Sequence, residues 1–176
     1  YTPLQDPEAD PARVLSCQRA RCSDPAVSPD GSKIAYTRND SEIWLLDLNG
    51  DGTSERISPE GHQAWGPLWS PTGRLSYYNF TVQQYVVLDL GTGKSLTWAN
   101  ESGQSATWAP GGSALVAPDG FAVETDILRG PSGENSNQQV DPSELEPVVV
   151  VNSQLMVYPV GGTAVTNLSD EEMACL

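Results

Sequence analysis

Residues 24–58 read DPAVSPDGSKIAYTRNDSEIWLLDLNGDGTSERIS, and residues 66–98 read GPLWSPTGRLSYYNFTVQQYVVLDLGTGKSLTW. The two stretches align with Pro29 opposite Pro71, an offset of 42 residues, and their most apolar segments keep the same offset. A third copy opens as SATWAPGGSALVAP, in which Pro110 lies 39 residues beyond Pro71. Self-similarity at a nearly fixed period is the sequence signature of a repeat architecture.

Each copy of the repeat predicts four short strands separated by tight turns. The Ser-Pro-x-Gly stretches at 28–31 and 70–73 predict turns, because Pro presets the backbone and Gly supplies a positive φ. The third strand of each copy, 42–48 or 84–90, is the most apolar. No long stretch shows the 3.6-residue apolar period of a helix. The sequence therefore predicts an all-β fold of about three to four four-stranded antiparallel β-propeller blades.

The repeat divides the chain into four segments. We expect an irregular N-terminal arm (1–23), propeller repeats (24–117), a long polar loop or insertion (118–146), and final blade strands with a C-terminal tail (147–176). The loop is expected from the polar run GPSGENSNQQVDPSELEP, and it is a candidate contact element. Propellers typically close with about four to eight blades. The chain is therefore expected to be part of a larger propeller, a partial propeller completed by another chain, or a small four-bladed one.

The charge of the chain limits its partners. Nine Lys and Arg residues oppose 23 Asp and Glu residues, which gives a formal net charge of −14 and a pI near 4.1. Such a field repels phosphate backbones and anionic lipid, so neither nucleic acid nor a membrane surface is expected as a partner. A protein partner with a basic surface is favoured instead. The longest strongly apolar run, Val148 to Val151, is far too short to span a membrane.

Cysteines and glycosylation sequons predict a location outside the cytoplasm. The three cysteines, Cys17, Cys22 and Cys175, cannot all pair within one chain. Either Cys17 and Cys22 close a small loop, or one of them pairs with Cys175. Asn-x-Ser/Thr sequons begin at Asn39, Asn79, Asn100 and Asn167. Their number indicates an extracytoplasmic protein that is periplasmic, secreted or on the cell surface.

One turn has the ligand pattern of a calcium loop. Residues 47–55 fit D-x-N-x-D-G-x-x-E, and the candidate ligands are Asp47, Asn49, Asp51, Thr53 and Glu55. Their oxygen atoms and the Gly at the bend suit Ca²⁺. The alternative is that Asn-Gly-Asp-Gly is a hairpin turn without a metal. The second repeat supports this alternative, because it makes its corresponding turn with Gly91-Thr92-Gly93 and lacks the carboxylates.

The sequence shows no catalytic motif. His62 is the single histidine, no G-x-S-x-G nucleophile elbow occurs, and the cysteine spacing does not match a structural zinc site. We therefore expect no catalytic residues, and we interpret His62 as a loop residue. The tryptophans near the blade ends either line a ligand-binding mouth or, as we expect, pack blade against blade. They are Trp65, Trp69, Trp98 and Trp108.

The segments SPDGSKIAYTRN, EIWLLDLNGDG, WSPTGRLSYYN and YVVLDLGTGK resemble the WD40-like repeat of TolB-type β-propellers. The same repeat builds the propeller domains of prolyl-oligopeptidase-family peptidases. The resemblance covers about residues 24–117 and resumes at 155–169. It implies a propeller fold and says little about function, because such repeats serve as binding platforms in many settings.

The functional expectation is a non-catalytic, extracytoplasmic scaffold or protein-interaction subunit of a larger homo- or hetero-oligomeric assembly. The first alternative is the substrate-gating propeller of a prolyl-oligopeptidase-like peptidase, whose catalytic domain would contain G-x-S-x-G. The second alternative is a carbohydrate-binding propeller, whose affinity would depend on exposed Trp side chains.

Overall fold

The computed structural model describes residues 17, 19–50, 52–129, 146–161 and 165–167. All regular elements among these residues are β-strands and none is a helix, which confirms the all-β prediction. The strands of the first two repeats are β1 (Cys22–Val27), β2 (Lys33–Arg38), β3 (Glu42–Asp47), β4 (Ser54–Arg56), β5 (Ala64–Trp69), β6 (Leu75–Asn79), β7 (Gln84–Asp89) and β8 (Lys94–Ala99). They are followed by β9 (Thr107–Trp108), β10 (Ala114–Arg129), β11 (Glu146–Pro159) and β12 (Thr166–Asn167).

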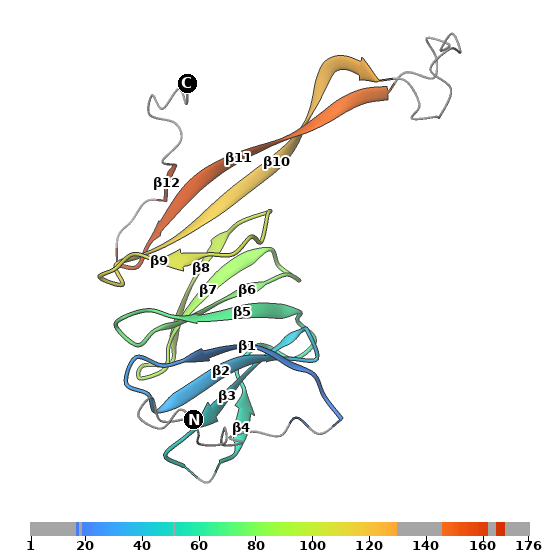
Figure 1. The fold of residues 1–176 in the computed structure, drawn as a ribbon. Coiled ribbons are helices and arrows are strands. Elements are labelled where there is room, and N and C mark those ends of the chain that lie inside the picture. The colour runs from blue at the N-terminus through green and yellow to red at the C-terminus, as the bar shows by residue number, and fades with distance from the viewer. Residues whose placement is uncertain (1–16, 18, 51, 130–145, 162–164, 168–176) are drawn as a thin grey trace, which may run out of the picture.

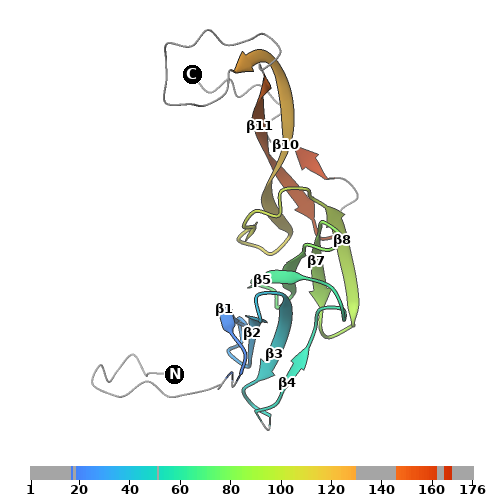
Figure 2. The ribbon, with the colours of Figure 1, turned by 90° about the vertical axis from the view of Figure 1, so that its right-hand side faces the viewer.

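The strands form three antiparallel four-stranded meanders. In each sheet every strand pairs with the next one along the chain, so the sheets are β1–β4, β5–β8 and β9–β12. We call them the first, second and third sheets. They stack in chain order (Figure 1). β1 and β5 lie along one edge of the stack, here called the first-strand edge, and β4 and β8 lie along the opposite edge (Figure 2).

The Ser-Pro-x-Gly turns recur as predicted. Gly31 and Gly73 have φ values of 72° and 83°, which side chains other than Gly adopt rarely. In both turns the backbone N–H of the Gly donates to the carbonyl of the Ser three residues earlier. The hydroxyl of that Ser, Ser28 or Ser70, accepts a 2.9 Å hydrogen bond from the backbone beyond the turn. The third copy closes the same turn without the hydroxyl, at Gly112.

Two apolar clusters hold the sheets together. The cluster between the first and second sheets contains Ala35, Ile43, Leu45, Ala64, Leu75, Tyr77 and Val86. The cluster between the second and third sheets contains Tyr78, Tyr85, Leu115, Ala117 and Tyr158. Adjacent residues of a strand point to opposite faces of their sheet. Tyr77 and Tyr78 of β6 accordingly belong to different clusters, and the second sheet is packed on both faces.

The structure differs from the sequence prediction over part of residues 118–146. β10 continues to Arg129 and β11 begins at Glu146, so 118–129 form a strand and not a polar loop. The two strands pair from Ala114 opposite Pro159 to Arg129 opposite Glu146, and they extend beyond the rest of the stack (Figure 1). The polar run that led to the prediction begins only at residue 130, whereas the β-branched run at 148–151 favours a strand. Residues 130–145 lie outside the described residues.

Candidate functional site

The first-strand edge carries the same irregularity in two successive sheets. β1 has a bulge between Ser23 and Ala26, and β5 has one between Trp65 and Leu68. Each bulge contains a residue in the left-handed region directly before a proline, namely Asp24 at φ 50° and Gly66 at φ 64°. Bulges bend a strand and re-aim its side chains. Both first strands are thereby bent at the same position, 42 residues apart in the chain.

A cavity of ≈ 180 Å³ opens beside these bulges. Its lining includes Asp24, Trp65, Leu68, Tyr78, Tyr85 and Gln104. They come from β1, from three strands of the second sheet and from the connection to the third sheet. The Trp65 side chain is 49% exposed although it is large and apolar. Asp24 is the one charged residue that lines the cavity among the described residues.

The tyrosine wall of the cavity is fixed by hydrogen bonds to backbone carbonyls. The Tyr78 hydroxyl donates to the carbonyl of Asn100 at 2.7 Å, and the Tyr85 hydroxyl donates to the carbonyl of Gln104. Burial raises the pKa of both phenols, so both remain protonated donors at neutral pH. Gly103 lets the connection approach the Tyr78 ring, since a Cβ there would lie 2.5 Å from Cε1 of Tyr78. The wall therefore has little freedom to move.

Three of the four tryptophans singled out in the sequence pack between sheets, as expected. Trp69 and Trp108 are packed against the two apolar clusters, and each donates from Nε1 to the preceding sheet. Their acceptors are the carbonyl of Ala26 and the hydroxyl of Ser76, both at 3.0 Å. Trp98 packs against the second cluster. Trp65 differs, because its half-exposed indole lines the cavity.

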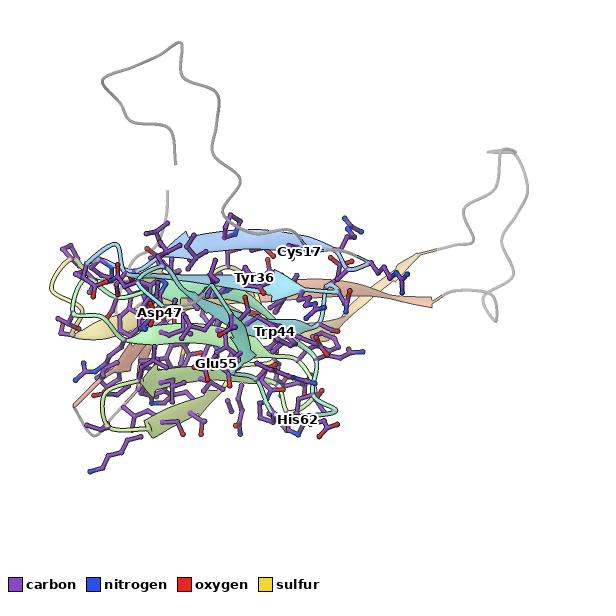
Figure 3. The ribbon with its side chains drawn as sticks, turned by 90° about the horizontal axis from the view of Figure 1, so that it is seen from below. Cys17, Tyr36, Trp44, Asp47, Glu55 and His62 are labelled. Carbon is purple, nitrogen blue, oxygen red and sulfur yellow. A yellow bond between two sulfur atoms is a disulfide. The ribbon has the colours of Figure 1, made fainter. Side chains whose placement is uncertain are left out.

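The proposed calcium loop has an internal cation close to its first carboxylate. Asp47 accepts a 2.6 Å ion-paired hydrogen bond from Lys33 Nζ and a 2.9 Å hydrogen bond from the backbone of Asn49. The hydrogen bond from Lys33 lowers the pKa of Asp47 below its ordinary value. Lys33, Asp47, Thr53 and Glu55 line one small depression, and Asp47 and Glu55 come from adjacent strands (Figure 3).

Of the other two candidate ligands, Asn49 does not line this depression and Asp51 lies outside the described residues. Among the residues that the structure describes, no three His, Cys, Asp or Glu side chains gather as metal ligands do. Asp89 of the second repeat also accepts from the backbone of its turn, at Gly91 and Thr92. An aspartate that caps a hairpin turn is thus common to both repeats. Calcium binding stays the prediction from the sequence, and the Lys33–Asp47 ion pair favours the alternative of a hairpin turn without a metal.

His62 and two of the sequon asparagines have structural partners. His62 lies in the connection from β4 to β5 (Figure 3), where its Nδ1 accepts a 2.9 Å hydrogen bond from the Asn79 amide. Asn79 and Asn100 are only 3% and 1% exposed. Asn100 donates to the Pro118 carbonyl at 3.0 Å and to the Tyr158 hydroxyl at 2.8 Å. These two sequons are therefore explained by packing, and they no longer count toward an extracytoplasmic location.

The outer face of the first sheet combines apolar residues with charged ones, namely Arg38, Glu42 and Arg56, the last two joined in an ion pair. Because Ala35, Ile43 and Leu45 face the second sheet, their strand neighbours point to the opposite side. That side carries Val27, Ile34, Tyr36, Trp44 and Leu46, and Tyr36 pairs with Trp44 across β2 and β3 (Figure 3). Tyr36 and Leu46 are buried, whereas Val27 is 56% exposed. Val27 stands where the other two sheets have Trp69 and Trp108.

The outer face of the third sheet is apolar. Leu115, Ala117 and Tyr158 face the second sheet, so the alternate positions point away from it. Those positions are Ala114, Val116, Pro118, Leu155, Val157 and Pro159. Leu155 is 49% exposed, and Val116, Pro118 and Val157 are half-buried. The stack thus ends on an apolar face at the third sheet and on a mixed face with exposed Val27 at the first sheet.

No family model matches this sequence, and no curated protein matches it. In the described part of the chain, no helix is long and apolar enough to cross a membrane. Cys17 and Cys22 form a disulfide, the first of the two pairings left open by the sequence, and Cys175 lies outside the described residues.

Proposed function

We propose that the chain forms three successive blades of a TolB-type, WD40-like β-propeller and acts as a non-catalytic, extracytoplasmic protein-interaction scaffold. Three observations support the propeller: each sheet is an antiparallel meander, the sheets stack face to face, and the bulges recur along one edge. In a propeller this first-strand edge would line the central channel. A scaffold of this kind holds its loops and its channel rigidly against a partner.

The observation that carries the scaffold role is a contact between sheets that occurs twice, here called the joint. Trp69 and Trp108 lie in the first strands of their sheets, and the indole Nε1 of each donates a hydrogen bond to the preceding sheet. The outer faces lack such a joint among the described residues: Val27 occupies the tryptophan position of the first sheet, and Leu155 of β11 is exposed on the outer face of the third sheet. Apolar side chains exposed on an outer sheet face are normally covered in a folded protein. We propose that further propeller blades, in a larger assembly, cover them.

The disulfide and the charge agree with this proposal. Disulfides persist mainly in oxidising compartments, which favours a location outside the cytoplasm for the Cys17–Cys22 pair. The net charge of −14 favours a protein partner with a basic surface and disfavours phosphate-rich partners.

The scaffold role is tested by placing a charge on each outer face. Val27→Asp and Leu155→Asp should each weaken the assembly in which the protein occurs, because an unpaired carboxylate would be buried at the new joint. Leu96→Asp is the matched control, since Leu96 is a comparably exposed leucine on β8 at the opposite edge of the stack. Analytical ultracentrifugation of complexes isolated by a tag on this chain measures the effect. Equal assembly of all three variants and the unmodified protein would contradict the proposal.

A further inference from the structure

We propose that the cavity at the first-strand edge binds an Arg or Lys side chain of the protein partner, held between the Asp24 carboxylate and the Trp65 indole. This inference rests on the proposed protein-binding function and names the chemistry that its channel would recognise. Asp24 and Trp65 both line the cavity and come from neighbouring first strands.

Asp24 presents a carboxylate without a cationic partner in the described part of the chain. Its oxygen accepts a 3.1 Å hydrogen bond from the hydroxyl of the adjacent Ser23. The ion pairs of the described residues use other acids, namely Asp40, Asp47 and Glu42. Charge-assisted hydrogen bonds from a guanidinium or ammonium group are the strong partners of a carboxylate. Asp24 therefore retains its capacity to bind a cation.

The second sheet shows that an acid is not needed for this bulge. Gly66 occupies the position equivalent to Asp24 and has a similar left-handed φ of 64°. Glycine adopts this region freely, whereas Asp at φ 50° is less favourable, and the following Pro25 restricts it further. The first sheet thus carries a carboxylate at a site where backbone geometry favours glycine, beside a cavity.

Trp65 supplies a second feature that favours a cation. Its side chain is 49% exposed, and its Nε1 donates to no described residue, in contrast to Trp69 and Trp108. A cation over an indole face is attracted by the ring quadrupole, and a planar guanidinium also stacks on it. Arg38 already lies 4.5 Å from the ring centroid of Trp44 in the first sheet, which shows this contact elsewhere in the molecule.

The remaining wall fits one side chain and adds no competing charge. The Tyr78 and Tyr85 hydroxyls already donate to carbonyls, and among the described residues no Lys or Arg lines the cavity. A volume of ≈ 180 Å³ exceeds the roughly 150 Å³ cavity that is known to admit benzene, a group larger than guanidinium. The polar residues Gln104 and Ser105 also line the cavity.

The experiment titrates the full chain with acetyl-Gly-Arg-Gly-amide and follows the Trp65 indole signal by NMR, with isothermal titration calorimetry for the affinity. Acetyl-Gly-citrulline-Gly-amide is the neutral isostere. We expect saturable binding of the arginyl peptide, at least about tenfold weaker binding of the citrulline peptide, and weakening by added salt. Asp24→Asn and Trp65→Ala should each weaken arginyl binding by about tenfold or more.

Controls separate a binding role from a structural one. Glu60→Gln removes one exposed negative charge from the connection between β4 and β5, away from the cavity lining, and should leave the affinity unchanged. Trp65→Phe retains an aromatic face in case Trp65→Ala perturbs the fold, and it should bind with intermediate affinity. Circular dichroism confirms folding of each variant.

Several results would overturn the inference. They are no saturable binding of the arginyl peptide, equal binding of the citrulline peptide, or an affinity that is insensitive to Asp24→Asn. Binding of cellotriose that depends on Trp65 and not on Asp24 would make the cavity a carbohydrate site instead. If assembly depends on Val27 and Leu155 but the peptide does not bind, this inference fails and the proposed function stands. If the peptide binds but the protein forms no assembly, the proposed function fails and the cation site stands.

Discussion

Trp69 Nε1 donates a 3.0 Å hydrogen bond to the carbonyl of Ala26, and so joins the second sheet to the first strand of the first sheet. Trp108 repeats the arrangement one sheet later with the Ser76 hydroxyl as acceptor. The indole also packs against the apolar cluster of its joint in both cases. One residue position therefore combines apolar packing with a directed hydrogen bond at two successive joints.

Replacing Trp69 with Phe should lower the free energy of unfolding. The substitution removes the hydrogen bond to Ala26 and part of the packed ring, at a combined cost of about 1–3 kcal/mol. Trp65→Phe is the matched control and should change stability by less than about 0.5 kcal/mol, because Trp65 is half-exposed. Urea denaturation followed by circular dichroism measures both values. Equal stability of the two variants would contradict the role given to Trp69.

Gly103→Ala should be strongly destabilising. The new Cβ would lie 2.5 Å from Cε1 of Tyr78, and the backbone φ of 57° disfavours a side chain. We expect a loss of about 1–3 kcal/mol. Gly111→Ala provides the comparison, because a Cβ at Gly111 meets nothing within 4 Å and its φ is not positive. Thermal unfolding should place the melting temperature of the Gly103 variant well below that of the Gly111 variant.

Asn100→Ala should disrupt the connection between the second and third sheets. Asn100 donates to the Tyr158 hydroxyl and accepts a 2.8 Å hydrogen bond from the backbone of Gly103, all in a buried site. The partners left unsatisfied should cost about 2–4 kcal/mol. Asn49→Ala, at an exposed asparagine whose φ is not positive, is the control. Urea denaturation measures the free energy of unfolding of both variants. A decrease for Asn100→Ala no greater than that of the control would show that the buried hydrogen bonds contribute little.

Asp30 should contribute stability that depends on pH. Hydrogen bonds from Ser28 Oγ and from the backbone and hydroxyl of Ser32 lower its pKa from 3.8 to about 2. A lowered folded-state pKa stabilises the protein above pH 3.8, and this stabilisation is lost as the pH falls toward about 2. In Asp30→Asn this part of the acid dependence should disappear. The free energy of unfolding is measured by urea denaturation between about pH 2 and pH 5 for both proteins. An equal decrease in the two proteins as the pH falls would contradict the assignment to Asp30.

Millimolar CaCl₂ should leave the melting temperature unchanged. The ammonium group of Lys33 already neutralises Asp47, and the turn is closed by its own backbone hydrogen bonds. Differential scanning calorimetry with CaCl₂ and with chelator measures the shift. A rise in melting temperature with calcium that is lost in Glu55→Gln would instead establish the calcium loop predicted from the sequence.

The repeat made much of the fold predictable. Ser-Pro-x-Gly turns and apolar third strands are local signals, so the strands of the first two sheets follow from the sequence. The extent of β10 and β11 was not predicted, because their pairing joins residues from opposite sides of the polar run at 130–147. Pairings between distant segments leave no local pattern beyond β-propensity.

The candidate cavity was harder to anticipate. Trp65 does not share the repeat position of Trp69 and Trp108, but its exposure is set by the neighbouring sheet and not by the repeat. Asp24 had one available signal: it occupies the repeat position that carries Gly66, directly before a proline in both copies. Their proximity to Gln104 depends on how three sheets stack, which the sequence pattern does not specify.

Mass spectrometry of the complex isolated from its source, under conditions that preserve assemblies, would show whether further blades join these three sheets. We expect a particle well above 18.8 kDa in which these residues are joined by further blades, either in additional chains or in a longer covalent chain. A stable, folded monomer of 18.8 kDa at the protein's natural concentration would contradict it.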